Sequence, residues 1–457
     1  MKLLGILWNS LGNEKSNAIR DIEMYSSITE KIEVDLNDKF PDFIRELYPF
    51  NEDEKWKAEY KISGLYNQYE NNTITILVLE IEPGEKVFLK QKNKYMYKNV
   101  LDLKVFIRRK YRHLIKNNML EEKLKVNYDN VFHMTDDEME YSENLPVILK
   151  YLSDKIIRRN GFLDIDKFVD YNNERREESG TRNNIWITDS LMFKEEPKGT
   201  FEASAEVFSS YVYKKAGFNT ALYDFADFRS QHGVITKKVY SNNECFFDGV
   251  SIMRFDRNIS KKDQIMNNNI PTIIHNLKLF CTKHGFSYNS IIEKELIKLY
   301  IFDLLFLQPD RNPSNYGFVF DSKKRPHLVI FDNSNILLSD DETKIKLYER
   351  GSIDAFKESV CKPTFLLLNQ SDNCFENKIN LFRNLFSNAT IEEKQIINEY
   401  LRILNFDSIN SVINEIENEK CYQFQPPFKK MVFECYGKYT AEIQNIIAHD
   451  EKRLIKK

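Results

Sequence analysis

The feature that most constrains the fold is a strongly apolar stretch at residues 296–307, which runs directly into the polar sequence Gln308-Pro309-Asp310-Arg311-Asn312. The stretch has about half of the roughly 20 residues that a bilayer-spanning helix needs, so we expect a buried helix inside a globular core. Such a core requires ample apolar material, and 42% of the residues are hydrophobic. We therefore predict packed domains rather than disorder.

The length and the charge of the chain limit the kind of protein that it can be. A chain of 457 residues exceeds what one hydrophobic core usually organises, which predicts two or three domains. Its 66 basic and 69 acidic side chains leave a formal charge of −3, which gives no overall signal for nucleic acid or an anionic membrane. The six cysteines are widely spaced without a CxxC pair, and the apolar run at residues 3–8 is too short for a secretion signal. These features predict a cytoplasmic protein with reduced thiols and no membrane partner.

Residues 1–150 are expected to form an α+β domain of their own. Apolar runs at residues 3–8 and 74–79 predict buried strands. Helical spacing of apolar residues appears at residues 43–48 and again at 103–114. This mixture of patterns predicts helices packed on a small sheet.

A polar, turn-rich passage follows this domain, and we predict a linker at residues 151–178. Beyond it, residues 185–194 are predicted to form a strand hairpin, and residues 201–215 a helix that ends at Gly217. Helices are expected from about residue 273 onward. Further strands are predicted at residues 233–240, 252–255, 317–320 and 327–331.

Three oxygen-bearing side chains follow the buried helix in an order that fits phosphoryl transfer. Asp310 and Asn315 lie five residues apart in a loop, and Asp332 ends the strand-like run after it. Phosphoryl transfer needs a carboxylate that orients and deprotonates the attacking hydroxyl, and oxygen ligands that hold Mg²⁺ on the nucleotide phosphates. Asp310 is the candidate base, and Asn315 and Asp332 are the candidate metal ligands. An Asp-Pro-Asn surface turn is the simpler alternative, but it explains neither the preceding helix nor the terminal Asp332.

A kinase also needs a cation on the phosphates and an acid that anchors this cation. Lys194 at the end of the predicted hairpin and Glu206 on the following helix are placed to pair. Ordinary surface charges are the alternative for either residue alone. Upstream, small residues and one glycine would let backbone N–H groups cover phosphates; these residues are Ser179, Gly180, Thr181 and Arg182.

Together these residues resemble the HipA-like serine/threonine kinases, including the CtkA-like branch, over residues 175–360. The resemblance implies an α+β, atypical bilobal protein-kinase-like fold. Its N-lobe would occupy residues 179–272, and a helical C-lobe with a C-terminal extension would occupy residues 273–457. ATP and Mg²⁺ are the implied cofactors, and a protein Ser or Thr is the implied acceptor. The motifs that carry the resemblance are Leu191-Met-Phe-Lys194, Ala205-Glu206, Gly233-Val-Ile-Thr-Lys237, Asp310-Arg-Asn-Pro-Ser-Asn315 and Phe331-Asp-Asn333.

The resemblance also implies a role for each matching residue. Asp310 would be the catalytic base, and Lys194 would contact the phosphates. Asn315 and Asp332 would hold the metal. The adenine hinge would include Ile235, Thr236 and Lys237.

Biological expectations come from the family alone. Its members often autophosphorylate in the phosphate loop, which would make Ser179 or Thr181 the acceptor here. Many act as bacterial growth-arresting toxins beside a helix-turn-helix antitoxin, so a toxin or defence effector with such a partner is one expectation. This chain departs from the family at Asn312, where a histidine is usual.

The first domain resembles nucleoside diphosphate kinases more weakly. Asn130-Val-Phe-His133-Met-Thr-Asp136 keeps the spacing of that family's active-site motif, and Arg108 falls about where the family has a phosphate-binding arginine. The resemblance implies a ferredoxin-like fold in which His133 accepts a phosphoryl group beside Arg108. Trp8-Asn9-Ser10 replaces that family's Lys-Pro-Asp, which predicts a degenerate site. A histidine that merely precedes a helix N-cap is the alternative.

Positive charge is concentrated in this domain. Residues 86–125 carry 13 basic and 3 acidic side chains, a net charge of +10. A solvated helix face and a surface that senses nucleotide or phosphate both fit such a run, and both interpretations stay open.

We therefore predict an ATP- and Mg²⁺-dependent serine/threonine protein kinase preceded by an α+β domain. A kinase of a small molecule or lipid is one alternative, because the catalytic loop recognises only a hydroxyl. A non-catalytic protein that senses nucleotide is another. Nucleic-acid binding through residues 86–125 ranks last, because no recognised module accompanies the charge.

Overall fold

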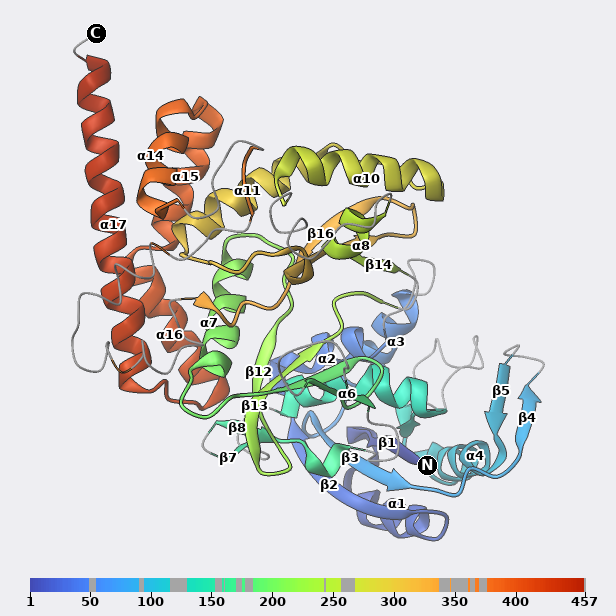
Figure 1. Cartoon of the computed structure of the whole chain (residues 1–457). Coiled ribbons are helices and arrows are strands. Elements are labelled where there is room, and N and C mark those ends of the chain that lie inside the picture. Colours follow the sequence, from blue (N-terminus) through green and yellow to red (C-terminus); the bar gives the residue numbers. More distant parts are fainter. Residues whose placement is uncertain are drawn as a thin grey trace. The chain divides into compact units, whose positions relative to one another are not determined.

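The computed structural model describes residues 1–48, 55–89, 94–115, 130–152, 158–159, 161–169, 175–176, 184–241, 244–255, 268–336, 346, 361, 366–369 and 376–455 (Figure 1). The chain divides into two compact units. The first comprises Met1–Arg159, Leu163–Phe193 and Asp227–Arg229. The second comprises Asn160–Phe162, Lys194–Ala226 and Ser230–Lys457.

The first unit is an α+β domain built on a four-stranded antiparallel sheet. Its strands are β1 (Lys2–Leu7), β2 (Ser27–Asp35), β3 (Thr73–Glu80) and β6 (Phe132–Met134), in the order β2-β3-β1-β6. Each neighbouring pair runs antiparallel. The strand β3 lies between β1 and β2, which are joined by α1 (Lys15–Glu23). This order is the split β-α-β arrangement of a ferredoxin-like fold. The predicted α+β, ferredoxin-like domain and its two predicted strands are confirmed.

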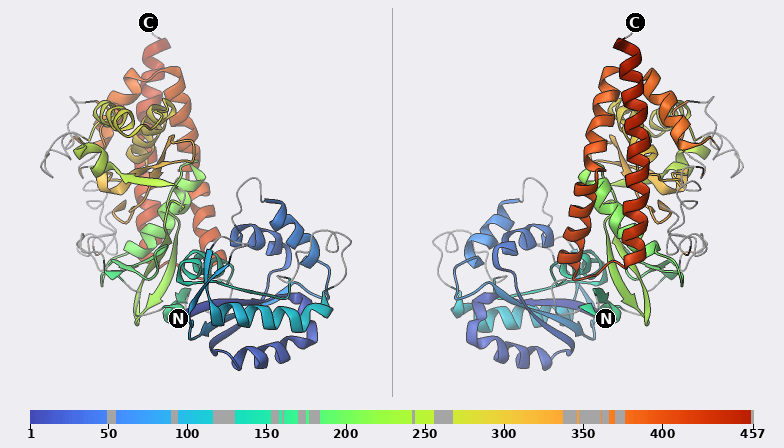
Figure 2. Two further views of the ribbon diagram at one scale, coloured as in Figure 1. Left: turned by 90° about the vertical axis from the view of Figure 1, so that its right-hand side faces the viewer. Right: turned by 90° about the vertical axis from the view of Figure 1, so that its left-hand side faces the viewer.

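Helices cover both faces of this sheet. One face packs on α1 and α4 (Lys98–Tyr111) (Figure 2). Phe132 and Met134 belong to the apolar core on that face. Because successive side chains of a strand alternate between faces, His133 points to the other face. The helices of that other side are α2 (Phe40–Leu47), α3 (Lys55–Leu65) and α6 (Glu138–Leu152), of which α6 contacts β1. The other strands before Leu191 are β4 (Lys86–Leu89), β5 (Lys94–Tyr97), β7 (Arg158–Arg159), β8 (Phe162–Asp164), β9 (Arg175–Arg176) and β10 (Asn184–Trp186).

The second unit takes up the chain at Lys194, near the end of β11 (Leu191–Glu195). It continues with α7 (Glu202–Lys215), β12 (Tyr223–Phe228) and β13 (Gln231–Lys237), and β13 lies between β12 and β11 in the strand order. At the start of α7, the Glu196 side chain accepts a hydrogen bond from the Ala203 N–H at 2.9 Å, a backbone group that has no partner within the helix. Gly217 follows the helix with φ of +84°, a conformation that favours glycine. The predicted hairpin is present as the neighbouring strands β10 and β11, and the predicted helix is present as α7.

A second, antiparallel sheet contains β14 (Cys245–Asp248), β15 (Tyr316–Phe320) and β16 (Pro326–Ile330). The expectation of a strand at residues 252–255 is wrong, because these residues belong largely to the short helix α8 (Gly249–Arg254). The cause is local: the Asp248 carboxylate accepts the Ser251 N–H at 2.7 Å and so caps a helix start. The segment between α7 and β12 contacts this sheet, because the Ile330 N–H of β16 donates to the Asn219 carbonyl at 2.9 Å.

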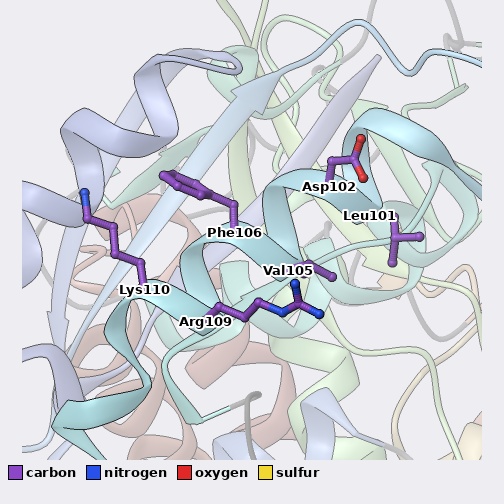
Figure 3. Close-up of a pocket in the computed structure, with 6 residues that line it drawn as sticks. All are labelled: Leu101, Asp102, Val105, Phe106, Arg109 and Lys110. Atoms are coloured by element: carbon purple, nitrogen blue, oxygen red, sulfur yellow. The ribbon is translucent and has the colours of Figure 1, made fainter.

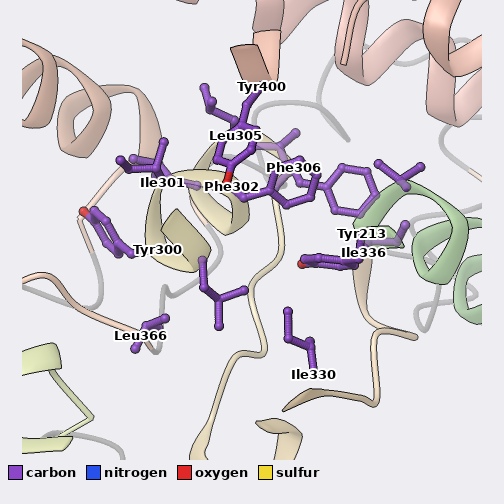
Figure 4. Packing of buried hydrophobic residues seen from close by; sticks show 14 of the residues in the cluster. Tyr213, Tyr300, Ile301, Phe302, Leu305, Phe306, Ile330, Ile336, Leu366 and Tyr400 are labelled. Carbon is purple, nitrogen blue, oxygen red and sulfur yellow. The ribbon is translucent and has the colours of Figure 1, made fainter. Parts of the chain in front are cut away.

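Helices complete the second unit. They are α10 (Ile270–His284), α11 (Ile291–Leu305), α14 (Lys378–Asn388), α15 (Ile391–Ile403), α16 (Phe406–Lys420) and α17 (Pro426–Ile455). The predicted buried helix is confirmed as α11, whose residues 299–305 are all buried. Figure 4 shows Phe302 and Phe306 packed close to Tyr213 of α7 and Tyr400 of α15. In the described part of the chain, no helix combines the length and the apolar character needed to cross a membrane.

Candidate active site

The Lys194 side chain is held between two carboxylates of the second unit. Its Nζ lies 2.9 Å from Glu206 Oε1 on α7 and 3.0 Å from Asp332 Oδ1 beyond β16. Lys194 and Glu206 are buried, whereas the Asp332 side chain is 39% exposed. Burial alone would lower the pKa of Lys194, but the carboxylates, Glu206 above all, more than offset it and hold this pKa well above its ordinary value. The expected pairing of Lys194 with Glu206 is therefore present, and the lysine stays a cation.

Backbone hydrogen bonds of Asp332 and its two neighbours hold Asp332 in an unusual conformation. Its φ of +56° lies in the left-handed region, which costs free energy in a residue other than glycine. Its N–H donates to the Tyr223 hydroxyl at 3.0 Å, and the next N–H, of Asn333, donates to Glu206 Oε2 at 2.9 Å. The preceding N–H, of Phe331, donates to the Asn315 carbonyl at 3.2 Å. Three consecutive amides thus orient the carboxylate that reaches Lys194.

A fully buried arginine joins the loop to the helix before it. Arg311 Nε donates to Asp303 Oδ2 of α11 at 2.9 Å, and both side chains are almost completely excluded from solvent. The same guanidinium donates to four further acceptors: Tyr213 Oη (2.9 Å), Asn333 Oδ1 (2.8 Å) and the carbonyls of Asn315 (2.9 Å) and Phe331 (3.3 Å). This network connects the loop of Asp310 with the segment of Asp332.

The Asp310 carboxylate is surrounded by amides. Oδ1 accepts from Asn312 Nδ2 at 2.7 Å, and Oδ2 accepts from Asn335 Nδ2 at 2.8 Å and from Asn315 Nδ2 at 3.2 Å. Burial raises the pKa of Asp310; the Asn312 amide opposes this rise, and the charge of Asp332 adds to it. The structure therefore brings the candidate base and both candidate metal ligands into one connected cluster.

The candidate hinge residues form the end of β13. Ile235 and Thr236 are buried, Lys237 is exposed, and Thr236 Oγ1 donates to the Leu222 carbonyl at 3.0 Å. Because β13 neighbours β11, these residues belong to the sheet that carries Lys194. The candidate phosphate-loop residues Ser179, Gly180, Thr181 and Arg182 lie outside the described residues.

In the first unit, His133 lies on strand β6 itself, whereas Arg108 contacts this strand from α4. His133 Nδ1 lies 2.9 Å from the Tyr48 hydroxyl at the end of α2. Arg108, on α4, donates through Nε to the Phe132 carbonyl at 2.9 Å. Lys61 is buried, with Nζ 5.3 Å from the centre of the Tyr48 ring and 3.4 Å from Asn130 Oδ1. A buried cation and an imidazole therefore both contact Tyr48.

Four of the eight basic side chains that the structure describes within residues 86–125 form ion pairs in the first unit. Lys98 pairs with Asp102 at 2.7 Å, and Lys110 pairs with Asp21 at 2.7 Å. Lys94 and Lys104 both pair with Asp136. The exposed side of α4 also has an open, shallow pocket lined by Leu101, Asp102, Val105, Phe106, Arg109 and Lys110 (Figure 3). For the exposed pairs of Lys98 and Lys110 these contacts fit a solvated helix face, whereas Lys104 is buried.

Three contributors to the second unit's site were missed by sequence reasoning. Asp303 could have been noticed, because an acid inside an apolar helix needs a partner. Asn335 lies three residues after Asp332, but an asparagine in a polar loop gives no distinguishing signal. Tyr223 reads as an ordinary strand residue, and only the fold brings its hydroxyl to Asp332.

Comparison with known proteins gives matches at the level of structure. No protein-family model and no curated protein sequence matches the chain. The structure is similar to that of the proinflammatory kinase CtkA of Helicobacter pylori, with a TM-score of 0.47 and 14% identity over 64% of this chain and 98% of that chain. It is also similar to HipA of Shewanella oneidensis MR-1, from a toxin–antitoxin complex with HipB and operator DNA, with a TM-score of 0.38 and 11% identity over 66% of this chain and 70% of that chain. The mixture of sheets and helices in the structure itself confirms the predicted α+β fold class.

Proposed function

We propose that the second unit is a kinase that transfers the γ-phosphoryl group of ATP to a serine or threonine hydroxyl of a protein. One observation carries this proposal: Lys194 Nζ contacts both Glu206 and Asp332, in the same connected network that holds the carboxylate of Asp310. A cation anchored by an acid, a metal-binding carboxylate and a general base are the parts that phosphoryl transfer requires.

The donor set suits Mg²⁺, which prefers oxygen ligands. Asn315 and Asp332 would hold the ion, and the partial exposure of the Asp332 carboxylate leaves it accessible from solvent. When bound, the ion would neutralise charge on the nucleotide phosphates. Lys194 would contribute a second positive charge, and Ile235 to Lys237 would contact the adenine. Ser179 to Arg182 would cover the phosphates.

Asp310 would act on the acceptor. Its carboxylate is only partly buried, so it can face an incoming hydroxyl and accept that group's proton. Asp310→Asn keeps the size of the side chain and removes the base. Transfer should therefore be lost while ATP still binds.

The test is intact-mass analysis of wild type, Asp310→Asn and the control Asp407→Asn after incubation with Mg²⁺-ATP. We expect phosphate on wild type and on the control, mapping to Ser179 or Thr181, and none on Asp310→Asn. Transfer by Asp310→Asn would contradict the proposal. ADP release that requires an added small molecule or lipid would indicate that kind of kinase instead, and binding without turnover would indicate a nucleotide sensor.

For the first unit we propose binding of a phosphate or nucleotide near His133. The observation in its favour is the buried Lys61 beside Tyr48, which also contacts His133. Arg108 lies on α4, which packs on the opposite face of the sheet from His133, so it is not part of this proposal. Acid-labile phosphate on His133 would support a catalytic role. ATP binding that His133→Ala and Lys61→Ala leave unchanged would contradict the proposal.

We further propose that phosphate transfer arrests bacterial growth and that a helix-turn-helix partner relieves this arrest. Induction of wild type in a bacterial host should slow growth, and Asp310→Asn at equal abundance should not. Equal growth of both strains would contradict a toxin role.

A further inference from the structure

Asp310 receives its hydrogen bonds from two different segments of the second unit. Asn312 belongs to the loop of Asp310 itself and donates to Oδ1 at 2.7 Å. Asn335 belongs to the segment that begins with Asp332 and donates to Oδ2 at 2.8 Å. Asn312 and Asn335 therefore give the shortest side-chain hydrogen bond to each carboxylate oxygen, and Oδ2 also accepts from Asn315 Nδ2 at 3.2 Å.

The orientation of both amides follows from their other contacts. Asn312 Oδ1 accepts the Ser314 N–H at 2.8 Å, which leaves the NH₂ group for Asp310. Asn335 Oδ1 accepts from the Ser334 hydroxyl at 3.3 Å. An ionised carboxylate only accepts hydrogen bonds, so an NH₂ group must face it on both sides. In both asparagines the NH₂ group therefore faces Asp310, and the amide oxygen accepts from a serine.

We propose that Asn312 and Asn335 form an amide clamp that positions the carboxylate of Asp310 for the acceptor hydroxyl. This inference rests on the proposed function. The clamp restricts rotation of the carboxylate because one amide holds each of its oxygens. It adds no charge, because an amide does not ionise. Asn335 is the informative member, because it connects the base to the segment that carries the metal ligand Asp332.

A positioning residue affects turnover more than nucleotide binding. Neither amide is among the residues assigned to contact ATP. Loss of one donor lets the carboxylate rotate away from the attacking geometry, and misplacement of a reacting group commonly lowers turnover by roughly ten- to a hundredfold. We therefore expect Asn335→Ala and Asn312→Ala each to lower kcat by about tenfold or more, with KM for ATP within about twofold of wild type.

The experiment measures ADP release from Mg²⁺-ATP, with kcat and KM determined separately, together with the thermal unfolding midpoint. The variants are Asn335→Ala, Asn335→Asp, Asn335→Gln and Asn312→Ala. Asn335→Asp keeps the shape but replaces the donor by a like charge, so it should be the slowest. Asn335→Gln keeps the NH₂ group and should recover part of the rate. Asn384→Asp, on the exposed face of α14, is the matched control and should behave as wild type.

The outcomes separate the clamp from the proposed function. A reduced kcat with unchanged KM, partial recovery by Asn335→Gln and an unchanged unfolding midpoint would support the clamp. An active wild type whose Asn335 variants keep kcat within about twofold would overturn the clamp alone, as would losses of kcat that only follow a lower unfolding midpoint. A wild type that releases no ADP with any acceptor would overturn the proposed function, and the clamp with it.

Discussion

The buried pair of Arg311 and Asp303 gives the most demanding test of how the second unit is built. At 2.9 Å and an effective dielectric constant of about 20, the gross attraction of the pair is about 6 kcal/mol. Desolvation of both charges offsets part of this attraction. Removal of one partner of a buried pair typically costs about 3–5 kcal/mol, because the other charge is left uncompensated. Arg311→Met should therefore destabilise the second unit by about this amount.

The loss of stability in Arg311→Met is limited by protonation of Asp303. Burial already raises the pKa of Asp303. Without the arginine, the carboxyl can take up a proton rather than stay charged, which limits the cost. The variant should then unfold about 10 °C below wild type, at about 2–4 °C per kcal/mol for a unit of this size.

The double variant Asp303→Leu with Arg311→Met separates stability from function. Replacing both charges by apolar groups should restore part of the stability, because neither charge then remains buried alone. The acceptors that lose the Arg311 donor keep the recovery incomplete. Phosphate transfer should stay low, because the carbonyls of Asn315 and Phe331 still lack the donor that Arg311 supplies.

Urea and thermal unfolding, followed beside ADP release, measure both effects. Arg325→Met is the matched control, since its pair with Asp321 is partly exposed and should be worth less than about 1 kcal/mol. The reasoning would be refuted if Arg311→Met cost no more than this control, or if the double variant transferred phosphate as wild type does.

Three further predictions concern single positions. Burial raises the pKa of Glu196 from 4.5 to about 7, so between these pH values the folded state keeps a proton that the unfolded state releases. The free energy of unfolding should therefore fall by up to about 3 kcal/mol as the pH rises from 4.5 to 7. Glu196→Gln should flatten this pH dependence, measured by urea unfolding. Gly249→Ala would place its Cβ 2.5 Å from the Pro313 carbonyl oxygen, so thermal unfolding should show a loss of stability of about 1–3 kcal/mol. In the control Gly437→Ala, the new Cβ in α17 would have no atom within 4 Å apart from its own helix backbone, and the stability should not fall. Asp332→Ala should weaken Mg²⁺-dependent ATP binding in calorimetry, and unchanged binding would argue against its role as a metal ligand.

Local patterns predicted most of the elements around the site. The apolar stretch at 296–307 became a buried helix, and the hairpin that ends at Lys194 and the helix with Glu206 lie where their patterns indicated. The strand expected at residues 252–255 is wrong because a single capping side chain, Asp248, decided between two conformations that the apolar pattern did not distinguish. Short apolar segments are ambiguous in this way whenever one hydrogen bond determines where a helix starts.

The sequence by itself determined the order of the chemical groups: a lysine, a helical acid, then Asp310, Asn315 and Asp332. This order is readable because each motif combines its residue types with a local hydrophobic period, and both are properties of neighbouring residues. Only the tertiary structure decided that Asn335 and Asn312 donate to Asp310, that Arg311 pairs with Asp303, and that β3 lies between β1 and β2. Such contacts join segments whose separation along the chain carries no periodic signal, because they depend on the path of the whole backbone and on which buried charges must be compensated.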